Sequence, residues 1–205
     1  MGNGNNSNIT RREGEVTTKD RQKILNQRPI TLWLTGLSAA GKSTLAYALE
    51  RQLVEMGYLC YVLDGDNIRH GLNSNLGFSV VDRSENIRRV AEVARLMNDA
   101  GLIVITAFIS PSRVDRERAK TIIGSEYFSE IFINSKLASC ETRDPKGLYK
   151  LARSGRISEF TGVSAPYEVP MNPDFEIVSD GESVDRSLKK LVDFVLPFLA
   201  GCYDS

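Results

Sequence analysis

The sequence predicts an α/β protein of three layers (α/β/α), with helices on both faces of a mainly parallel five-stranded sheet. Two observations support this prediction. Apolar segments of strand length alternate along the 205-residue chain with longer segments whose apolar residues recur at helical spacing. Segment 102–108 is almost wholly apolar, which is typical of a central strand buried on both faces. A chain of this length is enough for one domain with a full core.

The first predicted elements lie on either side of a turn that contains glycines. Segment 31–35 is predicted to be a short buried strand. Segment 42–56 is predicted to be a helix, because its apolar residues form one stripe and Gly57 follows as a stop signal. Segment 58–63, apolar on both faces, is predicted to be the second strand. The helical stripe consists of Leu45, Ala48, Leu49 and Leu53.

The middle of the chain repeats this order. Segment 84–100 is strongly amphipathic, with charged residues on one side, and Gly101 marks its end. We therefore predict a helix there, a third strand at 102–108 and another helix at 112–123. Strands that alternate with helices in this way favour parallel pairing and right-handed crossovers.

The last predicted elements are strands at 128–133 and 175–178 and a closing helix at 183–199. Residues 1–20 are rich in Asn, Gly, Thr and charged residues and have few large apolar ones. Such a segment cannot bury enough surface to offset its conformational entropy, so it is predicted to be a mobile tail. Residues 21–205 are then predicted to form a single domain.

Composition narrows the possible partners. The chain has 26 basic and 26 acidic residues, so a polyanion such as nucleic acid is not an expected partner of its whole surface. It has neither an apolar run of membrane-spanning length nor an apolar signal region, which predicts a cytoplasmic protein with no membrane partner. Cys60, Cys140 and Cys202 are far apart without metal-ligand spacing, and are predicted to be reduced thiols.

Residues 36–43 fit the pattern GxxxxGK[ST] between a predicted strand and a predicted helix. Gly36 and Gly41 let the backbone curl so that successive N–H groups point at phosphate oxygens. Lys42 would place an ammonium on the β- and γ-phosphates, and Ser43 would offer a hydroxyl to Mg²⁺. The sequence therefore predicts a P-loop NTPase/kinase fold with a Walker A motif. The expected ATP site comprises Gly36, Leu37, Ser38, Ala39, Ala40, Gly41, Lys42, Ser43 and Thr44.

Two carboxylates, Asp64 and Asp66, follow the second predicted strand. The third predicted strand ends without an acid, so Asp64 is the expected carboxylate of the magnesium site, together with Ser43. In an extended chain Asp66 would point to the same side and could orient an acceptor hydroxyl for in-line attack. The alternative is purely structural, an Asx-type turn or a helix N-cap.

A basic segment at about 143–162 is predicted to be a mobile basic lid over the phosphates. Between 143 and 156 it carries one acid, Asp144, against the basic residues Arg143, Lys146, Lys150, Arg153 and Arg156. Arg143 is the candidate that packs against the ATP base or its phosphates. The alternative is an ordinary solvated helix face.

Several longer motifs resemble the adenylylsulfate kinase family over roughly 32–170. The motifs lie at 63–73, 76–79, 82–89, 106–111, 143–150 and 160–162. The resemblance implies an enzyme with ATP, Mg²⁺ and adenylyl sulfate as ligands. It implies transfer of the γ-phosphoryl group to the ribose 3′-hydroxyl, giving 3′-phosphoadenylyl sulfate and ADP, in sulfate activation. It also implies a homodimer and allows a functional link to ATP sulfurylase.

The resemblance further implies an acceptor site. Phe78 and Phe160 would hold the adenine between their rings, and such stacking is worth about 1–3 kcal/mol per base in single-stranded nucleic acids. The alternative for both rings is core packing. The remaining implied acceptor residues are Asp66, Arg69, Arg83, Asn86, Ile109, Ser110, Lys146 and Leu148. The expected catalytic set is Lys42, Asp64, Asp66 and Ser110.

Two other functions stay open from the residues alone. A P-loop kinase of a sugar or a shikimate-like acid would share the phosphate loop and the Asp64–Asp66 pair, but would not need two phenylalanines for an adenine. A catalytically silent nucleotide-sensing domain would bind nucleotide without turnover.

Overall fold

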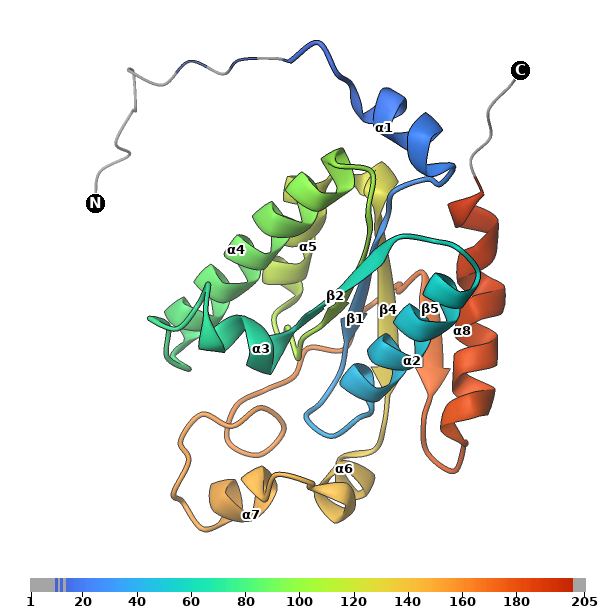
Figure 1. Ribbon diagram of the computed structural model, residues 1–205. Coiled ribbons are helices and arrows are strands. Elements are labelled where there is room, and N and C mark those ends of the chain that lie inside the picture. The colour runs from blue at the N-terminus through green and yellow to red at the C-terminus, as the bar shows by residue number, and fades with distance from the viewer. Residues whose placement is uncertain (1–9, 11, 13, 201–205) are drawn as a thin grey trace.

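Five strands form one parallel sheet in the order β2-β3-β1-β4-β5 (Figure 1). The computed structural model describes residues 10, 12 and 14–200. All four strand pairings are parallel, and Trp33 of the central strand lies opposite Thr106 on one side and Glu130 on the other. The strands are β1 (Thr31–Thr35), β2 (Cys60–Asp64), β3 (Ile103–Ala107), β4 (Phe128–Asn134) and β5 (Phe175–Val178).

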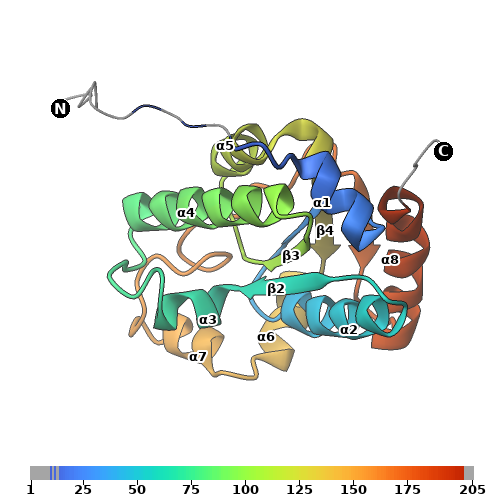
Figure 2. The same ribbon diagram turned by 45° about the horizontal axis from the view of Figure 1, so that its top comes forward.

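Helices cover both faces of this sheet, as Figures 1 and 2 show. On one face α2 and α8 pack over β1, β3 and β4, and on the other face α4 and α5 pack around Trp33. The α-helices are α1 (Thr18–Leu25), α2 (Lys42–Glu55), α3 (Gly65–His70), α4 (Val80–Asp99), α5 (Arg113–Ile123), α6 (Leu137–Arg143), α7 (Leu148–Arg153) and α8 (Val184–Leu199). A 3₁₀ turn, Ser125–Tyr127, precedes β4.

The predicted three-layer fold is confirmed, and its five strands are where the apolar runs indicated. The helix predicted from residue 84 begins earlier, at Val80. Ser79 caps it by accepting a hydrogen bond from the Asp82 backbone N–H. Val80 and Val81 are exposed, so no buried stripe marks this first turn.

The predicted tail, 1–20, extends too far toward the C-terminus, because helix α1 already begins at Thr18. Thr17 and Asp20 form a capping box that stabilises the helix start. No residue of α1 is buried, so apolar spacing could not reveal it. The helix is instead attached to α4 by polar contacts, since Arg21 and Thr18 both bind the Asp99 carboxylate. Residues 1–9, 11 and 13 lie outside the described part, and so does Cys202.

The cysteines and helices of the described residues can be compared with the predictions from composition. Cys60 and Cys140 are free thiols. Among the helices of the described ranges, none combines the length and apolarity needed to cross a membrane.

Gln27, which precedes β1, binds the loops that precede β2 and β3 at the amino edge of the sheet. Its side chain is buried and donates to the carbonyls of Leu59, at 2.9 Å, and Gly101, at 2.8 Å. The Leu59 backbone N–H donates back to the Gln27 side-chain oxygen at 2.7 Å. One side chain therefore satisfies backbone groups of the loops that precede β2 and β3.

We expect Gln27→Ala to lower the free energy of unfolding by about 2–4 kcal/mol, because the Gly101 carbonyl and the Leu59 N–H lose their hydrogen-bond partner. Urea denaturation would measure the loss. Gln52→Ala on α2 is the matched control, because the Gln52 side chain makes no hydrogen bond among the described residues and should change stability by less than about 1 kcal/mol. Equal losses in both variants would contradict the role given to Gln27.

Candidate active site

The loop between β1 and α2 adopts a conformation that requires glycine at two positions. Gly36 has φ +153°, and a Cβ there would lie 2.5 Å from the Ile133 carbonyl oxygen of β4. Gly41 has φ +105° at the start of α2. Ala39 also has positive φ, +58°, although it is not glycine. The loop therefore curls tightly against the sheet and directs the amino end of α2 toward the carboxyl edge of the strands.

Lys42 lies inside this curl. Its side chain is buried, and Nζ donates to the carbonyl oxygens of Gly36, at 2.9 Å, and Leu37, at 2.6 Å. Burial lowers the pKa of Lys42 from 10.5 to about 8, against a partial opposing effect of nearby groups that include Asp64. An ammonium that is poorly solvated and held only by neutral carbonyls favours the approach of an anion.

This pKa predicts that nucleotide binding takes up a proton. A phosphate beside Nζ would raise the pKa of Lys42, so binding of Mg-ADP at pH 8 should take up about half a proton, and at pH 6.5 about none from this group. Calorimetry in buffers of different ionisation enthalpy would measure the uptake.

Lys42→Arg is the control for that measurement, because a guanidinium stays charged over the whole range. The variant should lose the difference in uptake between pH 6.5 and pH 8. An unchanged difference would assign the proton to another group.

Ser43 and Asp64 face each other across the start of α2 and the end of β2. Ser43 Oγ donates to Asp64 Oδ2 at 2.6 Å, and Asp64 Oδ1 accepts from the Asp66 backbone N–H at 2.9 Å. Asp64 is thus also the N-cap of α3, which is the structural role considered as the alternative from the sequence. One carboxylate oxygen serves as the cap, and the other accepts the hydrogen bond from Ser43. Within the described ranges no cluster of three or more His, Cys, Asp or Glu could hold a metal. One hydroxyl and one carboxylate suit Mg²⁺, which keeps several waters and binds substrate phosphates.

Asp66 does not lie in an extended chain, so the prediction that it points to the same side as Asp64 on that ground is wrong. It is in the first turn of α3, more than half exposed, and its carboxylate forms an ion pair with Lys146. Lys146 lies between α6 and α7, so this ion pair joins the predicted lid to the predicted catalytic carboxylate. Two residues assigned to the acceptor site from distant motifs are therefore brought into direct contact.

Phe78 presents an exposed ring to Arg69, which lies on α3 together with Asp66. The guanidinium of Arg69 lies 4.3 Å from the ring centroid, and Arg69 also donates to the carbonyls of Leu76 and Gly77. One ring face is thus supported by a cation, and 64% of the residue stays exposed. A solvent-exposed aromatic that is held in place is suited to stacking against a base.

Phe160 differs, because it belongs to the core. It is 8% exposed and packs edge-on against Tyr149, with ring centroids 5.0 Å apart. In this structure, the ring of Phe160 is therefore packed in the core, which is the alternative that the sequence left open. Tyr149 itself, given no role from the sequence, donates to the Ser38 carbonyl at 3.0 Å and so rests α7 on the P-loop.

Arg83 joins the two segments that carry these phenylalanines. Its Nε donates to the Phe78 carbonyl at 2.7 Å, and one terminal nitrogen donates to Thr161 Oγ1 at 2.6 Å. The other terminal nitrogen donates to the Glu159 carbonyl. The implied role in holding an anion therefore competes with three contacts to the protein. Asn86 is buried and accepts from Asn73 Nδ2 at 3.0 Å.

Ile109 and Ser110 follow β3. The carboxyl end of β3 lies close to Gly65, between Asp64 and Asp66, since a Cβ on Gly65 would be 3.3 Å from the Ala107 carbonyl oxygen. Ser110 is 2% exposed, and its Oγ is engaged with Trp33 and Thr35. Its catalytic role, which came from the resemblance, stays a prediction, and its side chain serves the loop structure here.

Arg143 lies against the P-loop backbone. It donates to the carbonyls of Ala39, at 3.4 Å, and Ser179, at 3.1 Å, and pairs with Asp180 at 3.5 Å. Ser179, missed in the sequence, adds a hydrogen bond from Oγ to the Ala40 carbonyl at 3.1 Å. The position suits the predicted contact with ATP.

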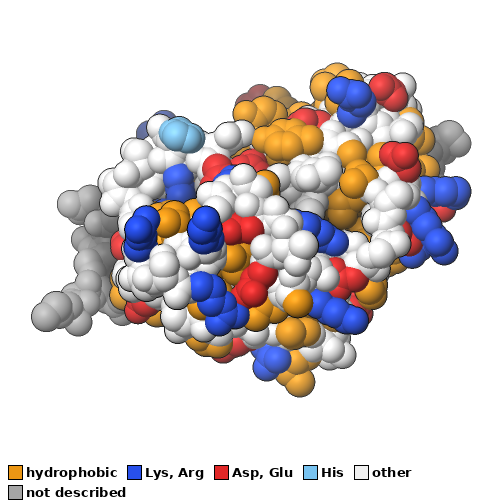
Figure 3. Space-filling view, turned by 90° about the horizontal axis from the view of Figure 1, so that it is seen from below, with side chains coloured by type: hydrophobic (Ala, Val, Ile, Leu, Met, Phe, Trp, Pro, Cys, Tyr) orange, Lys and Arg blue, Asp and Glu red, His pale blue; other side chains and the backbone are white. Residues whose placement is uncertain are grey.

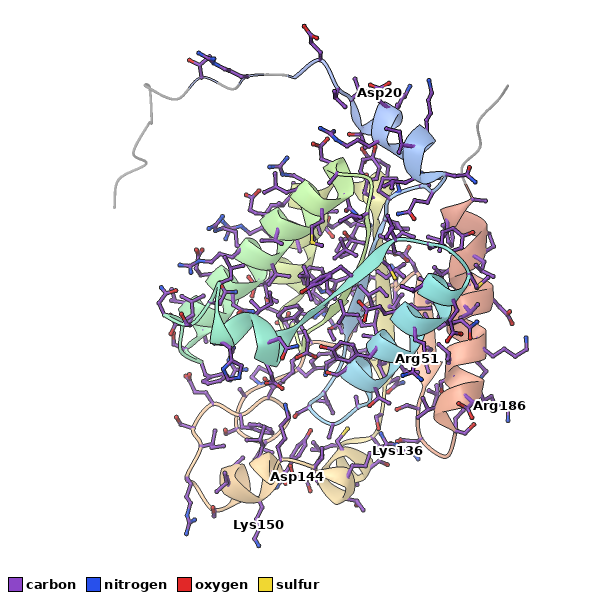
Figure 4. All side chains as sticks on the ribbon, viewed as in Figure 1. Asp20, Arg51, Lys136, Asp144, Lys150 and Arg186 are labelled. Atoms are coloured by element: carbon purple, nitrogen blue, oxygen red, sulfur yellow. The ribbon has the colours of Figure 1, made fainter. Side chains whose placement is uncertain are left out.

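The basic residues of the predicted lid do not act as one set. Arg143 and Lys146 point to the site, whereas Arg153 pairs with Glu141 at 2.5 Å and Lys150 points away from the sheet (Figure 4). Leu148 is half-buried against the core. Figure 3, which looks onto this edge of the sheet, shows Lys and Arg side chains interspersed with acidic ones. Lid closure stays a prediction.

The phosphate loop, the Ser43–Asp64 pair and the acidic start of α3 together define a P-loop phosphotransferase. A family model described as adenylylsulphate kinase matches residues 28–178. The chain belongs to the adenylylsulphate kinase family.

Curated relatives and solved structures agree with that membership. The chain is 51% identical over 191 residues to the adenylyl-sulfate kinase of Geotalea daltonii, covering 93% of this chain and 94% of the relative. It is 53% identical over 179 residues to that of Vibrio cholerae, covering 87% and 83%. The solved Mycobacterium tuberculosis APS kinase in complex with AMPPNP and APS superposes with a TM-score of 0.79 and 45% identity, covering 82% and 98%. A gluconokinase from Sinorhizobium meliloti, at 14% identity and a TM-score of 0.53, shares the fold alone.

Proposed function

We propose that this enzyme phosphorylates the ribose 3′-hydroxyl of adenylyl sulfate with ATP, giving 3′-phosphoadenylyl sulfate and ADP for sulfate assimilation. The observation that carries the proposal is the contact of Lys146 with Asp66, which lies on the same short helix as Arg69, whose guanidinium lies over the exposed ring of Phe78. A carboxylate that can accept a hydroxyl proton, a cation for an anionic group and an aromatic face for a base are the three parts that this acceptor needs.

The residues divide the work as follows. Lys42 and the loop amides hold the β- and γ-phosphates, and Asp66 orients the attacking hydroxyl in line with the γ-phosphorus. Lys146 and Arg69 hold the charged part of the acceptor, and the ring of Phe78 holds its base. Ser43 and Asp64 would hold Mg²⁺, which supplies neutralisation of phosphate charge when bound. Because phosphoryl transfer needs little covalent help, position and electrostatics carry most of the rate enhancement.

The proposal extends to the protein's setting. We propose a homodimer in the cytoplasm, with a functional link to the ATP sulfurylase that supplies adenylyl sulfate. The Thiobacillus denitrificans APS kinase described as hexameric, at 31% identity and a TM-score of 0.63, supports self-association in the family, although this chain covers only 29% of it. Sedimentation equilibrium would test the dimer, and a monomer at micromolar concentration would contradict it.

The test of the activity is ADP release with Mg-ATP and one acceptor at a time. Adenylyl sulfate should support release, with a product one phosphate heavier by mass, while AMP, shikimate and gluconate should not. Release with a different acceptor would keep the phosphate loop and overturn the acceptor assignments. Nucleotide binding without release for any acceptor would favour the sensing domain.

A further inference from the structure

Arg116 on α5 is a buried cation outside the residues discussed so far. It is 3% exposed, and all of its guanidinium nitrogens are engaged. Nε donates to Glu130 of β4 at 2.6 Å, one terminal nitrogen to the Ser110 carbonyl at 2.7 Å and the other to the Glu168 carbonyl at 2.7 Å. One side chain therefore joins α5 and β4 to two loop segments at the carboxyl edge of the sheet.

The first of these segments needs outside support. Ser110 has φ +39°, a left-handed conformation that costs a non-glycine residue about 1–3 kcal/mol unless its surroundings hold it. Strand β1 holds the side-chain part, because Ser110 Oγ accepts from Trp33 Nε1 at 3.2 Å and donates to Thr35 Oγ1 at 2.9 Å. Thr35 in turn donates to the Ile109 carbonyl at 2.8 Å. Arg116 fixes the carbonyl that follows in the chain.

The second segment, 160–168, is joined to the turn at Ser110 by Arg116, which binds the Ser110 and Glu168 carbonyls. Two further contacts support this connection. The Glu168 backbone N–H donates to the Pro111 carbonyl at 2.9 Å, and Tyr167 OH lies 2.9 Å from Thr35 Oγ1. The Arg116 guanidinium lies 5.8 Å from the Tyr167 ring centroid. Tyr167 and Glu168, at the end of the segment, and the turn at Ser110 are thus held in one arrangement by Arg116 and Thr35.

Stability alone is a poor reason for this arrangement. Burial raises the pKa of Glu130 in spite of the neighbouring arginine. The cost of taking two charges out of water can exceed the attraction between them. An apolar pair of similar volume would often be as stable or more so. What an apolar pair could not do is hold two backbone carbonyls at fixed positions.

We infer that Arg116 is a positioning residue that sets the acceptor side of the active site by holding the Ser110 and Glu168 carbonyls. The inference rests on the proposed function, since it assigns 109–110 to the acceptor side. All guanidinium nitrogens of Arg116 are bound to the protein, so Arg116 is not among the residues proposed to contact either substrate. Its loss should therefore weaken use of the acceptor and leave the P-loop, which it does not contact, unchanged.

The experiment compares Arg116→Met and Arg116→Lys with Arg118→Met, an exposed arginine two residues along the same helix. Arg116→Met should raise KM for adenylyl sulfate about 10- to 100-fold and change KM for Mg-ATP less than about twofold. Arg116→Lys, which keeps the charge beside Glu130 but lacks the fork, should give a smaller rise of the same kind. Arg118→Met should behave as wild type.

A second readout uses Trp33, the single tryptophan of the sequence. Because its Nε1 donates to Ser110, its fluorescence should shift in Arg116→Met and not in Arg118→Met.

Unchanged acceptor KM in both Arg116 variants, or an equal rise of both KM values, would overturn the inference. If Arg116→Met fails to fold, Arg116→Lys decides. Wild-type turnover of adenylyl sulfate tests the proposed function separately, and the Trp33 shift does not depend on it.

Discussion

Replacing Asp66 by Asn should lower kcat about 10²- to 10³-fold with little change in stability or in either KM. The amide keeps the size of the side chain but cannot accept and orient the hydroxyl proton as a carboxylate does. The fold should survive, because the Asp66–Lys146 pair is more than half exposed on both sides and such pairs contribute about 0–1 kcal/mol. Steady-state kinetics with adenylyl sulfate would measure the change.

Lys146→Met is the informative comparison. It removes the same ion pair but leaves the carboxylate, so it should raise KM for adenylyl sulfate and spare most of kcat. If the ion pair itself were the functional element, the two variants would show the same pattern. Wild-type kcat in Asp66→Asn would remove Asp66 from the mechanism.

The sheet could be predicted because each buried strand leaves a local mark. A strand such as β3 is buried on both faces, and its apolar run is visible without knowledge of its neighbours. The P-loop could be predicted for the same reason, since the close approach of Gly36 to β4 and the role of Lys42 are both encoded within eight consecutive residues. Helix α1 leaves no such mark, because it is attached by polar contacts to Asp99 rather than by a buried stripe.

The acceptor side could be predicted only in part. Asp66 was predicted from its place after the second strand and Lys146 from the resemblance, but no spacing rule would have paired residues 80 apart in sequence. The resemblance did not reveal that Arg83 donates its hydrogen bonds to Phe78 and Thr161, or that Phe160 packs on Tyr149. These outcomes depend on how separate loops meet at the carboxyl edge, which is a tertiary property. The Arg116 contacts are of the same kind.

Lys42 presents the sharpest conflict between stability and function, so Lys42→Met should lose activity and gain stability. Methionine fills much of the same space without a charge, and loss of the phosphate contact should lower kcat about 10²- to 10³-fold. The lowered pKa of Lys42, from 10.5 to about 8, means that keeping it protonated in the fold costs about 3 kcal/mol at pH 7. Removing the charge should recover part of that cost, about 1–3 kcal/mol, offset by the lost hydrogen bonds to Gly36 and Leu37.

The pH dependence tests the origin of this gain. Because the folded pKa lies below the unfolded one, the penalty is fully present below pH 8 and disappears as the pH rises toward 10.5. The stability advantage of Lys42→Met in urea denaturation should therefore shrink between pH 8 and pH 10. A variant that is less stable than wild type at pH 7 would contradict the argument, and would make its loss of activity a consequence of unfolding rather than of the missing charge.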